Sequence, residues 1–316
     1  MDPYLSIVIP IYNEEENIPA LWERLSKVMA EHFADPARPW EIILTDAGSR
    51  DRSLALLIEI AKAEPRVKVI EFNRNYGQHS AIFGAFAEVR GQVIVTLDAD
   101  LQNPPEEIPK LVAKMEEGYD VVGGWRQGRQ DNDSFFRTMP SKIVNAVTRR
   151  TTGVKLHDYG CMLRAYGRDV VDAMLLCKER SSFIPALANS FAKRITEVPV
   201  AHAERAAGES KYGLWKLINL QFDLLTSFSL LPLQMLSVFG VITAAVGFLL
   251  FLGLVAYRFL HPEGTAEGVF TLFAILFFFV GCQFIAFGLL GEYIGRIYQE
   301  VRDRPRYMVK KIHQEK

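Results

Sequence analysis

QVIVTLDADLQNPPEEIPKLV, residues 92–112, is the stretch of sequence that decides the fold. It begins as an apolar run rich in β-branched residues, becomes acidic at Asp98 and Asp100, and continues after two prolines into an amphipathic segment at 105–117. The first part predicts a buried strand, and the last predicts a helix that starts near a proline. A strand, a turn and a helix in this order form the repeating unit of an α/β domain.

The same unit recurs three times upstream of this stretch. Its copies are the apolar runs 5–12, 41–46 and 67–72, each followed by an amphipathic segment, 15–33, 51–63 and 78–89. Strands that alternate with helices of this length predict a mostly parallel sheet with helices on both faces. In such sheets, ligands bind outside the carboxyl ends of the strands.

Polar and acidic residues follow all four predicted strands. They are Pro10, Tyr12 and Glu14 after the first, Asp46, Ala47 and Ser49 after the second, Asn73 and Arg74 after the third, and Asp98 and Asp100 after the fourth. Because the carboxyl ends of parallel strands lie at one edge, these residues predict a single site. Taken alone, the Asp46 turn could equally be an ordinary turn and helix cap, and Glu14 a solvated acid of a first helical turn.

Asp98 and Asp100 are two residues apart at a strand end, so their carboxylates project to the same side. Together with Gln102 they offer the oxygen ligands that Mg²⁺ or Mn²⁺ prefers, leaving positions for water and a diphosphate. An isolated D-x-D is more often a solvated loop or a helix cap. Its place at the end of a buried strand favours a metal site.

A second group of candidate residues is basic. It comprises Arg126, Arg137 one helical turn before Ser141, Arg164 downstream of Asp158, and Arg205 and Lys211 on either side of a GES segment. These could be solvated surface charges. Beside an acidic metal site they favour binding of phosphates instead, with a bidentate fork from Arg and a point charge from Lys. The sequence has no P-loop and no GxGxxG after its first strand.

Apolar residues concentrate towards the C-terminus. Leu224–Tyr257 and Gly268–Gly291 are charge-free runs of about 34 and 24 residues, longer than the ~20 that cross a bilayer. They predict a two-helix transmembrane hairpin, with helices at about 236–258 and 268–290. The alternative, buried helices of a soluble core, is disfavoured by two runs of this length. Basic residues after the second run place both termini and the large N-terminal part in the cytosol.

Four segments follow from this pattern. We expect residues 1–211 to form a cytosolic domain, 212–234 to form juxtamembrane amphipathic helices lying in the interface, 235–291 to hold the two transmembrane helices, and 292–316 to form a cytosolic juxtamembrane segment. The formal net charge of −1 leaves no excess of cations to bind a nucleic acid. The three cysteines show no metal-site spacing and are predicted to be reduced thiols.

Five segments resemble the GT-A glycosyltransferases of family two that act on polyprenyl phosphates. They are IPIYNEEENI, DAGSRD, LDADLQNPPEEIPKLV, RNYGQHSAI and GESKY. Further segments, including DYGCMLRAY, ERSSFIPALAN and LLGEYIGRIY, are similar to an arabinose-type subgroup that acts on undecaprenyl phosphate. This resemblance implies a GT-A, Rossmann-like fold, a UDP-sugar donor, Mn²⁺ or Mg²⁺, a homo-oligomer, and a place in the bacterial inner membrane in lipid A modification.

The resemblance also implies residue roles. Pro10, Tyr12, Glu14, Asp46 and Ala47 would line the uridine pocket, and Arg205 and Lys211 would close over the diphosphate. Asp98 would face the donor, and Asp100 and Gln102, beside Asp98, would hold the metal. Arg126, Arg137 and Ser141 would grip the acceptor phosphate, and Asp158 would orient the acceptor or the sugar.

One position departs from the family pattern, which reads Asp-Asp-Gly-Ser where this chain has Asp46-Ala47-Gly48-Ser49. In the family, the second Asp accepts a hydrogen bond from uracil. Losing a bond to a charged acceptor costs on the order of 1.5–3 kcal/mol, which predicts donor binding roughly 10- to 150-fold weaker unless other groups recognise the base.

The expected reaction is a direct, inverting displacement by the acceptor phosphate at the anomeric carbon. Two alternatives stay open: transfer of glucose or another hexose to the same lipid, and a non-catalytic membrane adaptor with a decayed site. Only Ala47 supports the adaptor, whereas Asp98, Asp100, Gln102, Arg137 and Lys211 speak against it.

Overall fold

The computed structural model describes residues 2–126, 157–158, 160–177, 183–202, 231–260, 268–302 and 304–315. The chain divides into two compact units, one of Met1–Gln221 with Arg304–Lys316 and the other of Phe222–Asp303. Arg137, Ser141, Arg205, Lys211 and most of the predicted 212–234 segment lie outside the described residues.

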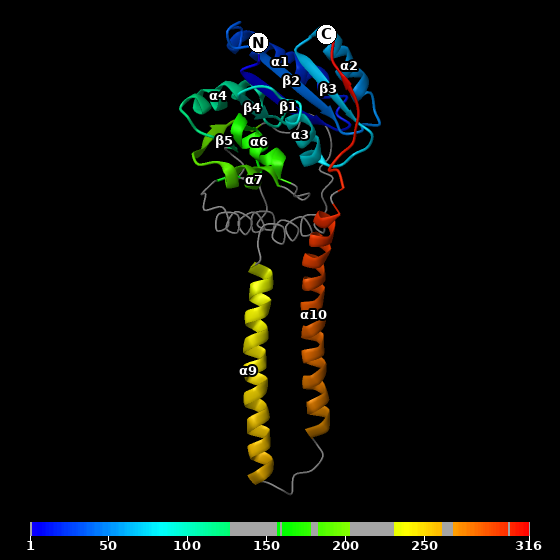
Figure 1. The fold of residues 1–316 in the computed structure, drawn as a ribbon, viewed down its shortest axis with the longest axis vertical. Coiled ribbons are helices and arrows are strands. Elements are labelled where there is room, and N and C mark those ends of the chain that lie inside the picture. Colours follow the sequence, from blue (N-terminus) through cyan, green and yellow to red (C-terminus); the bar gives the residue numbers. More distant parts are fainter. Residues whose placement is uncertain are drawn as a thin grey trace. The chain divides into compact units, whose positions relative to one another are not determined.

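Within its described residues, the first unit is built on an eight-stranded sheet with helices packed against it (Figure 1). The strands are β1 (Leu5–Ile11), β2 (Trp40–Asp46), β3 (Val67–Phe72), β4 (Val93–Thr96), β5 (Val121–Arg126), β6 (Arg164–Gly167), β7 (Ile195–Val200) and β8 (Val309–His313). Their spatial order is β7-β5-β6-β4-β1-β2-β3-β8. The four strands predicted from the apolar runs form its parallel centre, β4-β1-β2-β3.

The helices of the first unit cover both faces of the sheet, as the alternation of elements predicts. They are α1 (Ile18–His32), α2 (Ser53–Ala63), α3 (Gln78–Phe86), the short η1 (Pro105–Glu107), α4 (Ile108–Glu116), α6 (Arg168–Leu176) and α7 (Ile184–Phe191). One core cluster joins α1, α2 and α4 to one face, and a second joins α3, α6 and α7 to the other. Successive β1 residues alternate between the clusters, with Ile7 and Ile9 in the first and Val8 in the second, because strand side chains have a period of two.

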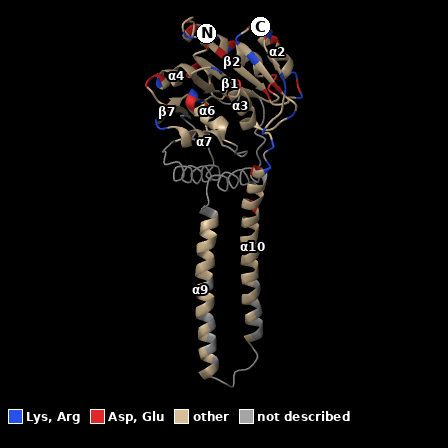
Figure 2. Cartoon of the chain, in the orientation of Figure 1, with Lys and Arg blue, Asp and Glu red and all other residues tan. Residues whose placement is uncertain are grey.

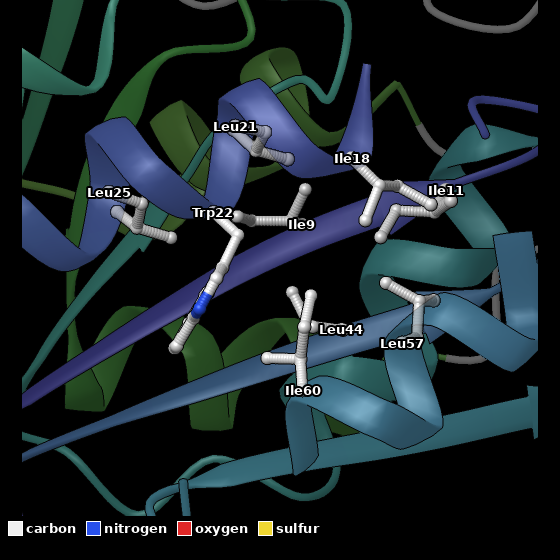
Figure 3. Close-up of a pocket in the computed structure, with 9 residues that line it drawn as sticks. All are labelled: Ile9, Ile11, Ile18, Leu21, Trp22, Leu25, Leu44, Leu57 and Ile60. Atoms are coloured by element: carbon white, nitrogen blue, oxygen red, sulfur yellow. The ribbon is translucent and has the colours of Figure 1, made fainter. Parts of the chain in front are cut away.

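The first cluster is closely packed. Trp22 of α1 extends over Ile9 of β1 and Leu44 of β2, with Leu57 and Ile60 of α2 opposite (Figure 3). These apolar side chains enclose a void of only about 10 Å³. A void of this size with few polar partners is a packing defect and not a ligand site. This layer therefore supports the strands whose ends carry the functional residues.

The two outer regions of the sheet were not foreseen in the sequence. β6 runs antiparallel between β4 and β5, and β8 pairs antiparallel with β3. Val309–His313, which lie within the predicted juxtamembrane segment 292–316, form the edge strand β8. β8 is half-exposed and short, so its apolar pattern is too weak to identify it from the sequence.

The second unit contains two long helices, α9 (Leu231–Leu260) and α10 (Val269–Val301). Figure 2 shows that Lys, Arg, Asp and Glu cluster on the first unit and are nearly absent from both helices. By length and composition, Phe278–Gly295 of α10 is apolar enough to cross a membrane, and α9 has a shorter apolar stretch, Leu233–Leu249. The two-helix transmembrane hairpin stays a prediction.

Candidate active site

The acidic motif lies directly after β4, at the carboxyl edge of the sheet. Asp98, Ala99 and Asp100 end in a tight turn where Leu101 has a φ of 60°, a value that is rare for a residue with a bulky side chain. Asp100 Oδ1 accepts a hydrogen bond from the Gln102 backbone N–H at 3.1 Å. Buried Leu101 and this bond fix the backbone, so the turn holds both carboxylates at the strand end.

Gln78 contacts the acidic motif from the neighbouring α3. Its Nε2 donates a hydrogen bond to Asp98 Oδ1 at 2.6 Å. Gln78 is the first residue of α3, which follows Gly77 with a φ of 90°. Sequence reasoning missed this contact. The available signal was the RNYGQHS segment, which follows the third predicted strand and so begins at the same edge.

Burial and like charge raise the pKa of Asp98 to about 7. Burial has the larger effect, and the Asp100 carboxylate adds to it, whereas Arg126 and the Gln78 hydrogen bond oppose the shift. Two neighbouring carboxylates in a partly buried place destabilise each other's charged form. A bound cation would therefore stabilise the charged form of Asp98.

Arg126 ends β5 and forms a bidentate ion pair with Asp158. Its Nε and Nη2 lie 2.6 and 2.9 Å from the two carboxylate oxygens. Burial would lower the pKa of Arg126, but the bonds to Asp158 outweigh this effect and keep the guanidinium charged. Among the described residues, two of the five Arg126 N–H groups donate to Asp158, and a guanidinium has further donors that can bind an anion.

The segment that carries Asp158 is anchored from two strands. Glu197 of β7 accepts the backbone N–H groups of His157 and Asp158 at 2.7 and 3.1 Å. Arg164 of β6 donates to the Asp158 and Cys161 backbone carbonyls at 2.8 and 2.9 Å. The expectation that Arg164 binds phosphate is wrong, because its side chain is fully buried and supports this segment instead.

The ends of β1, β2, β3 and β8 form a pocket of about 410 Å³, here named the edge pocket. Its lining residues are Tyr12, Asp46, Gly48, Ser49, Arg50, Leu54, Glu71, Phe72, Asn73, Arg74, Asn75 and Lys310. The pocket thus combines two carboxylates, three cations and two aromatic rings. β1 is the neighbour of β4, so the edge pocket and the acidic motif lie along the same edge of the sheet.

Cross-links between the first two loops hold the edge pocket in shape. The Asn13 N–H donates to Ser49 Oγ at 3.0 Å, and Asn13 Oδ1 accepts the Arg50 N–H at 2.8 Å. Asn13 has a φ of 55°, which Asn tolerates better than most residues. One residue further, the Glu14 N–H donates to Ser53 Oγ at 2.9 Å. Both loops are therefore fixed by hydrogen bonds before any ligand binds.

Asp46 and Gly48 shape the turn after β2. The buried Asp46 carboxylate accepts the backbone N–H of Gly48 at 3.2 Å and also that of Ser49. Burial raises the pKa of Asp46, and these hydrogen bonds partly offset the shift. Gly48 has a φ of 75°, and a Cβ there would lie 2.7 Å from the Arg74 carbonyl carbon. Only glycine allows the two loops to approach this closely.

The other sequence-predicted residues lie near this pocket without lining it. Ala47 is 3% exposed and packs in the second core cluster with Phe72. Pro10 lies within β1, opposite Thr45. Glu14 accepts a hydrogen bond from Asn17 at 2.6 Å and interacts electrostatically with Asp98. The expected roles of Ala47, Pro10 and Glu14 towards a nucleotide stay predictions.

The acidic motif suits a divalent cation that also binds a substrate. Among the described residues, no group of three or more His, Cys, Asp or Glu side chains is placed to hold a metal. The protein share would thus be the Asp98 and Asp100 carboxylates with the Gln102 amide, all oxygen donors, and a substrate would complete the shell. The raised pKa of Asp98 fits this donor set, because a bound cation supplies the missing counter-charge.

The mixed α/β sheet carries an acidic motif and a polar pocket along the edge where sheets of this kind bind ligands. The sequence model described as glycosyl transferase family 2 matches residues 6–175, just over half of the chain. The chain therefore belongs to glycosyl transferase family 2 and is a glycosyltransferase.

Full-length relatives refine this assignment. The chain is 55% identical over 310 residues to the undecaprenyl-phosphate 4-deoxy-4-formamido-L-arabinose transferase of Klebsiella pneumoniae subsp. pneumoniae, a match that covers 98% of this chain and 93% of the relative. It is 56% identical over 309 residues to the transferase of the same name from Pectobacterium carotovorum, with 97% and 93% covered. The similarity extends through both units.

Solved structures agree on the fold. The mannosyl-3-phosphoglycerate synthase of Rubrobacter xylanophilus matches with a TM-score of 0.51 and 13% identity, and the match covers 70% of this chain and 71% of the synthase. At this identity the likeness shows a common fold and carries no statement about substrate.

Proposed function

We propose that this enzyme transfers 4-deoxy-4-formamido-L-arabinose from a UDP-sugar to undecaprenyl phosphate, in lipid A modification. The observation that carries this proposal is the 55% identity to transferases of that name along nearly the whole chain. The described part of the site supports it, because the acidic motif, the edge pocket and Arg126 offer places for a cation, a nucleotide and a second anion.

The donor binds along the carboxyl edge of the sheet. Its nucleoside occupies the edge pocket beside Tyr12 and Asp46, which line it. Its diphosphate lies at the β4 end, where Asp98, Asp100 and Gln102 would hold Mn²⁺ or Mg²⁺. When bound, that cation neutralises charge on the diphosphate and on the departing UDP. Gln78 orients the Asp98 carboxylate through the 2.6 Å hydrogen bond.

The acceptor phosphate binds Arg126, whose guanidinium uses two of its five N–H groups for Asp158 within the described residues. Asp158 is then a positioning residue, because both of its carboxylate oxygens contact Arg126. Arg137 and Ser141 add to the acceptor site, and Arg205 and Lys211 close over the donor diphosphate. These last four roles rest on the family resemblance.

The reaction is an inverting displacement. An oxygen of the acceptor phosphate attacks the anomeric carbon and forms a new C–O bond there. The bond from that carbon to the UDP oxygen breaks, and its electron pair leaves with UDP. The acceptor oxygen is already anionic near neutral pH, so the protein contributes mainly by positioning the substrates and stabilising charge.

The helices α9 and α10 cross the membrane as a hairpin, with the glycosyltransferase domain and both termini in the cytosol. Their apolar composition supports this proposal. A polyprenyl phosphate keeps its hydrocarbon chain in the bilayer, so an enzyme anchored there meets the phosphate at headgroup depth. Assembly of several copies through the membrane helices is part of the same proposal.

The decisive experiment uses the purified full-length protein in detergent with undecaprenyl phosphate and a panel of UDP-sugars, with and without Mn²⁺. We expect UDP release only with the formamido-arabinose donor and only when both the lipid and the cation are present. Release confined to UDP-glucose or another UDP-hexose would refute the sugar assignment. No release with any donor, from protein whose folding is verified by thermal unfolding, would refute the function.

A further inference from the structure

The far C-terminal end of the chain contributes a side chain to the edge pocket. Lys310 of β8 and Glu71 of β3 both line the pocket, and Lys310 Nζ lies 2.6 Å from Glu71 Oε1. The two residues are 239 positions apart in the sequence. The Lys310 side chain is 63% exposed and that of Glu71 only 9%, so Glu71 forms the wall and Lys310 the rim.

A shift in strand register sets Lys310 apart from its neighbours. Glu71 pairs with Lys311 and Phe72 pairs with Val309, which leaves Lys310 with no residue opposite it. An extra residue in one strand is a β-bulge, and bulges beside functional sites re-aim side chains. Lys311 is exposed and does not line the pocket, although it has the same side chain. It is a matched control.

Both members of the pair keep capacity for a ligand. Glu71 Oε2 lies 3.0 Å from His313 Nε2, so each carboxylate oxygen has one partner among the residues that the structure describes. A carboxylate can accept about four hydrogen bonds and an ammonium group can donate three. Burial tends to raise the pKa of Glu71, but Lys310 and His313 outweigh it and hold that pKa below its usual value. Glu71 is thus an acceptor beside a donor at neutral pH.

The pair lies at the end of the site remote from the acidic motif. β1 and β2 lie between β4 and β3. Neighbouring strands are about 4.8 Å apart, so the β3 end is roughly 14 Å from the β4 end. A donor whose diphosphate lies beside Asp98 and Asp100 would direct its nucleobase towards β3.

From this arrangement, and resting on the proposed function, we infer that Glu71 and Lys310 select the nucleobase of the donor. The Glu71 carboxylate accepts the imide N–H of uracil, and the Lys310 ammonium group donates to a neighbouring carbonyl oxygen. Cytosine has a lone pair where uracil has that N–H, so it would face the carboxylate unfavourably. The pair therefore favours UDP over CDP and supplies a base contact that Ala47 does not.

The test measures the binding of UDP and of CDP to the full-length protein in detergent. We expect Glu71→Gln and Lys310→Gln each to weaken UDP binding on the order of tenfold, and Glu71→Gln to reduce the preference for UDP over CDP. Lys311→Gln should bind both nucleotides like the unchanged protein. Glu71→Gln with an unchanged UDP preference would overturn the inference.

A charge-reversed pair separates recognition from strand pairing. The double variant E71K/K310E keeps an ion pair between β3 and β8 but exchanges the positions of donor and acceptor. We expect its thermal unfolding midpoint to fall only in part, because the contact of Glu71 with His313 is lost while the pair between the strands is kept, and UDP binding to stay weak. Recovery of full UDP affinity would show that the pair only joins the strands.

The outcome for the unchanged protein separates this inference from the proposed function. If the unchanged protein releases UDP from the sugar donor while the Glu71→Gln variant keeps its preference for UDP over CDP, only the base-selecting role fails. If it binds no UDP at all, the proposed function fails and this inference fails with it.

Discussion

The edge pocket and the β4 end lie on one edge of the same sheet, yet they handle charge differently. In the edge pocket, Asp46 accepts backbone N–H groups and Glu71 contacts Lys310 and His313. At the β4 end, Asp98 and Asp100 repel each other, and the nearby Arg126 is committed to Asp158. Within the described residues, the carboxylates of the first region have partners in the protein, whereas a bound cation would stabilise the charged form of Asp98 in the second. Substitutions in the two regions should therefore have different consequences.

The largest expected effect follows from removing a cation ligand. Asp100→Ala should lower turnover about 10³-fold, because it removes an oxygen donor for the cation that offsets charge on departing UDP. Turnover is measured as UDP release at saturating donor and Mn²⁺. UDP binding without a cation should change little, since the edge pocket is intact. Normal turnover in this variant would remove the metal assignment.

The second largest effect concerns the buried ion pair of Arg126 and Asp158, at the same end of the sheet. Arg126→Ala should lower the free energy of unfolding by about 3 kcal/mol, because it leaves the Asp158 carboxylate partly buried without its bidentate partner. It should also raise the KM for undecaprenyl phosphate. Chemical denaturation and steady-state kinetics measure the two effects. The control is the double variant Arg126→Met with Asp158→Leu, in which stability should return to that of the unchanged protein while the KM for undecaprenyl phosphate stays raised. If the KM also returned to its original value, a role of Arg126 in acceptor binding would be excluded.

His79, the neighbour of Gln78, should contribute an acid-dependent loss of stability. Burial lowers the pKa of His79 to about 4, from an ordinary value of 6.5. The unfolded chain therefore takes up a proton between pH 6.5 and 4 that the folded protein does not, so His79 contributes a loss of roughly 3 kcal/mol as pH drops through that range, whereas Asp98, whose pKa is raised to about 7, contributes in the opposite sense. Thermal unfolding at pH 7 and 4.5, in the unchanged protein and in His79→Gln, isolates the His79 contribution, and the variant should lose less stability in acid. An equal loss in the variant would assign the acid sensitivity to other groups.

UDP binding in the edge pocket should be sensitive to changes in the backbone turn at Gly48. Gly48→Ala should cost about 2 kcal/mol of stability and weaken UDP binding, because its Cβ would lie 2.7 Å from the Arg74 carbonyl carbon. Gly77→Ala is the matched control, since Gly77 also has a positive φ but no atom lies within 4 Å of a Cβ there. Equal losses of UDP affinity in the two variants would mean that backbone strain, and not the close contact, is responsible.

The smallest expected effect concerns orientation at the β4 end. Gln78→Ala should lower kcat about tenfold, because Asp98 loses the 2.6 Å hydrogen bond that orients it. Gln78→Glu should be worse than Ala, since it adds a third negative charge beside Asp98 and Asp100. Steady-state kinetics for both variants test this order, and a Glu variant as active as the unchanged protein would contradict it.

Much of the parallel centre of the sheet could be predicted from the sequence. β1 to β4 are buried on both faces, so each reads as a continuous apolar run between turn residues. Their carboxyl ends had to meet at one edge, which placed Tyr12, Asp46 and Asp98 correctly. The antiparallel strands β6 (RAYG) and β8 (VKKIH) mix charged with apolar residues and were not predicted, whereas β4, also four residues long, is entirely apolar except for its last residue, a threonine.

The sequence by itself therefore determined the α/β class, the family and the acidic motif, because each depends on residues close together in the chain. Only the tertiary structure decided which distant groups meet: Gln78 with Asp98, Arg126 with Asp158, and Lys310 with Glu71. The physical reason is that the order of strands in the sheet sets these contacts. Nothing local in the Lys310 segment indicates that it pairs with β3.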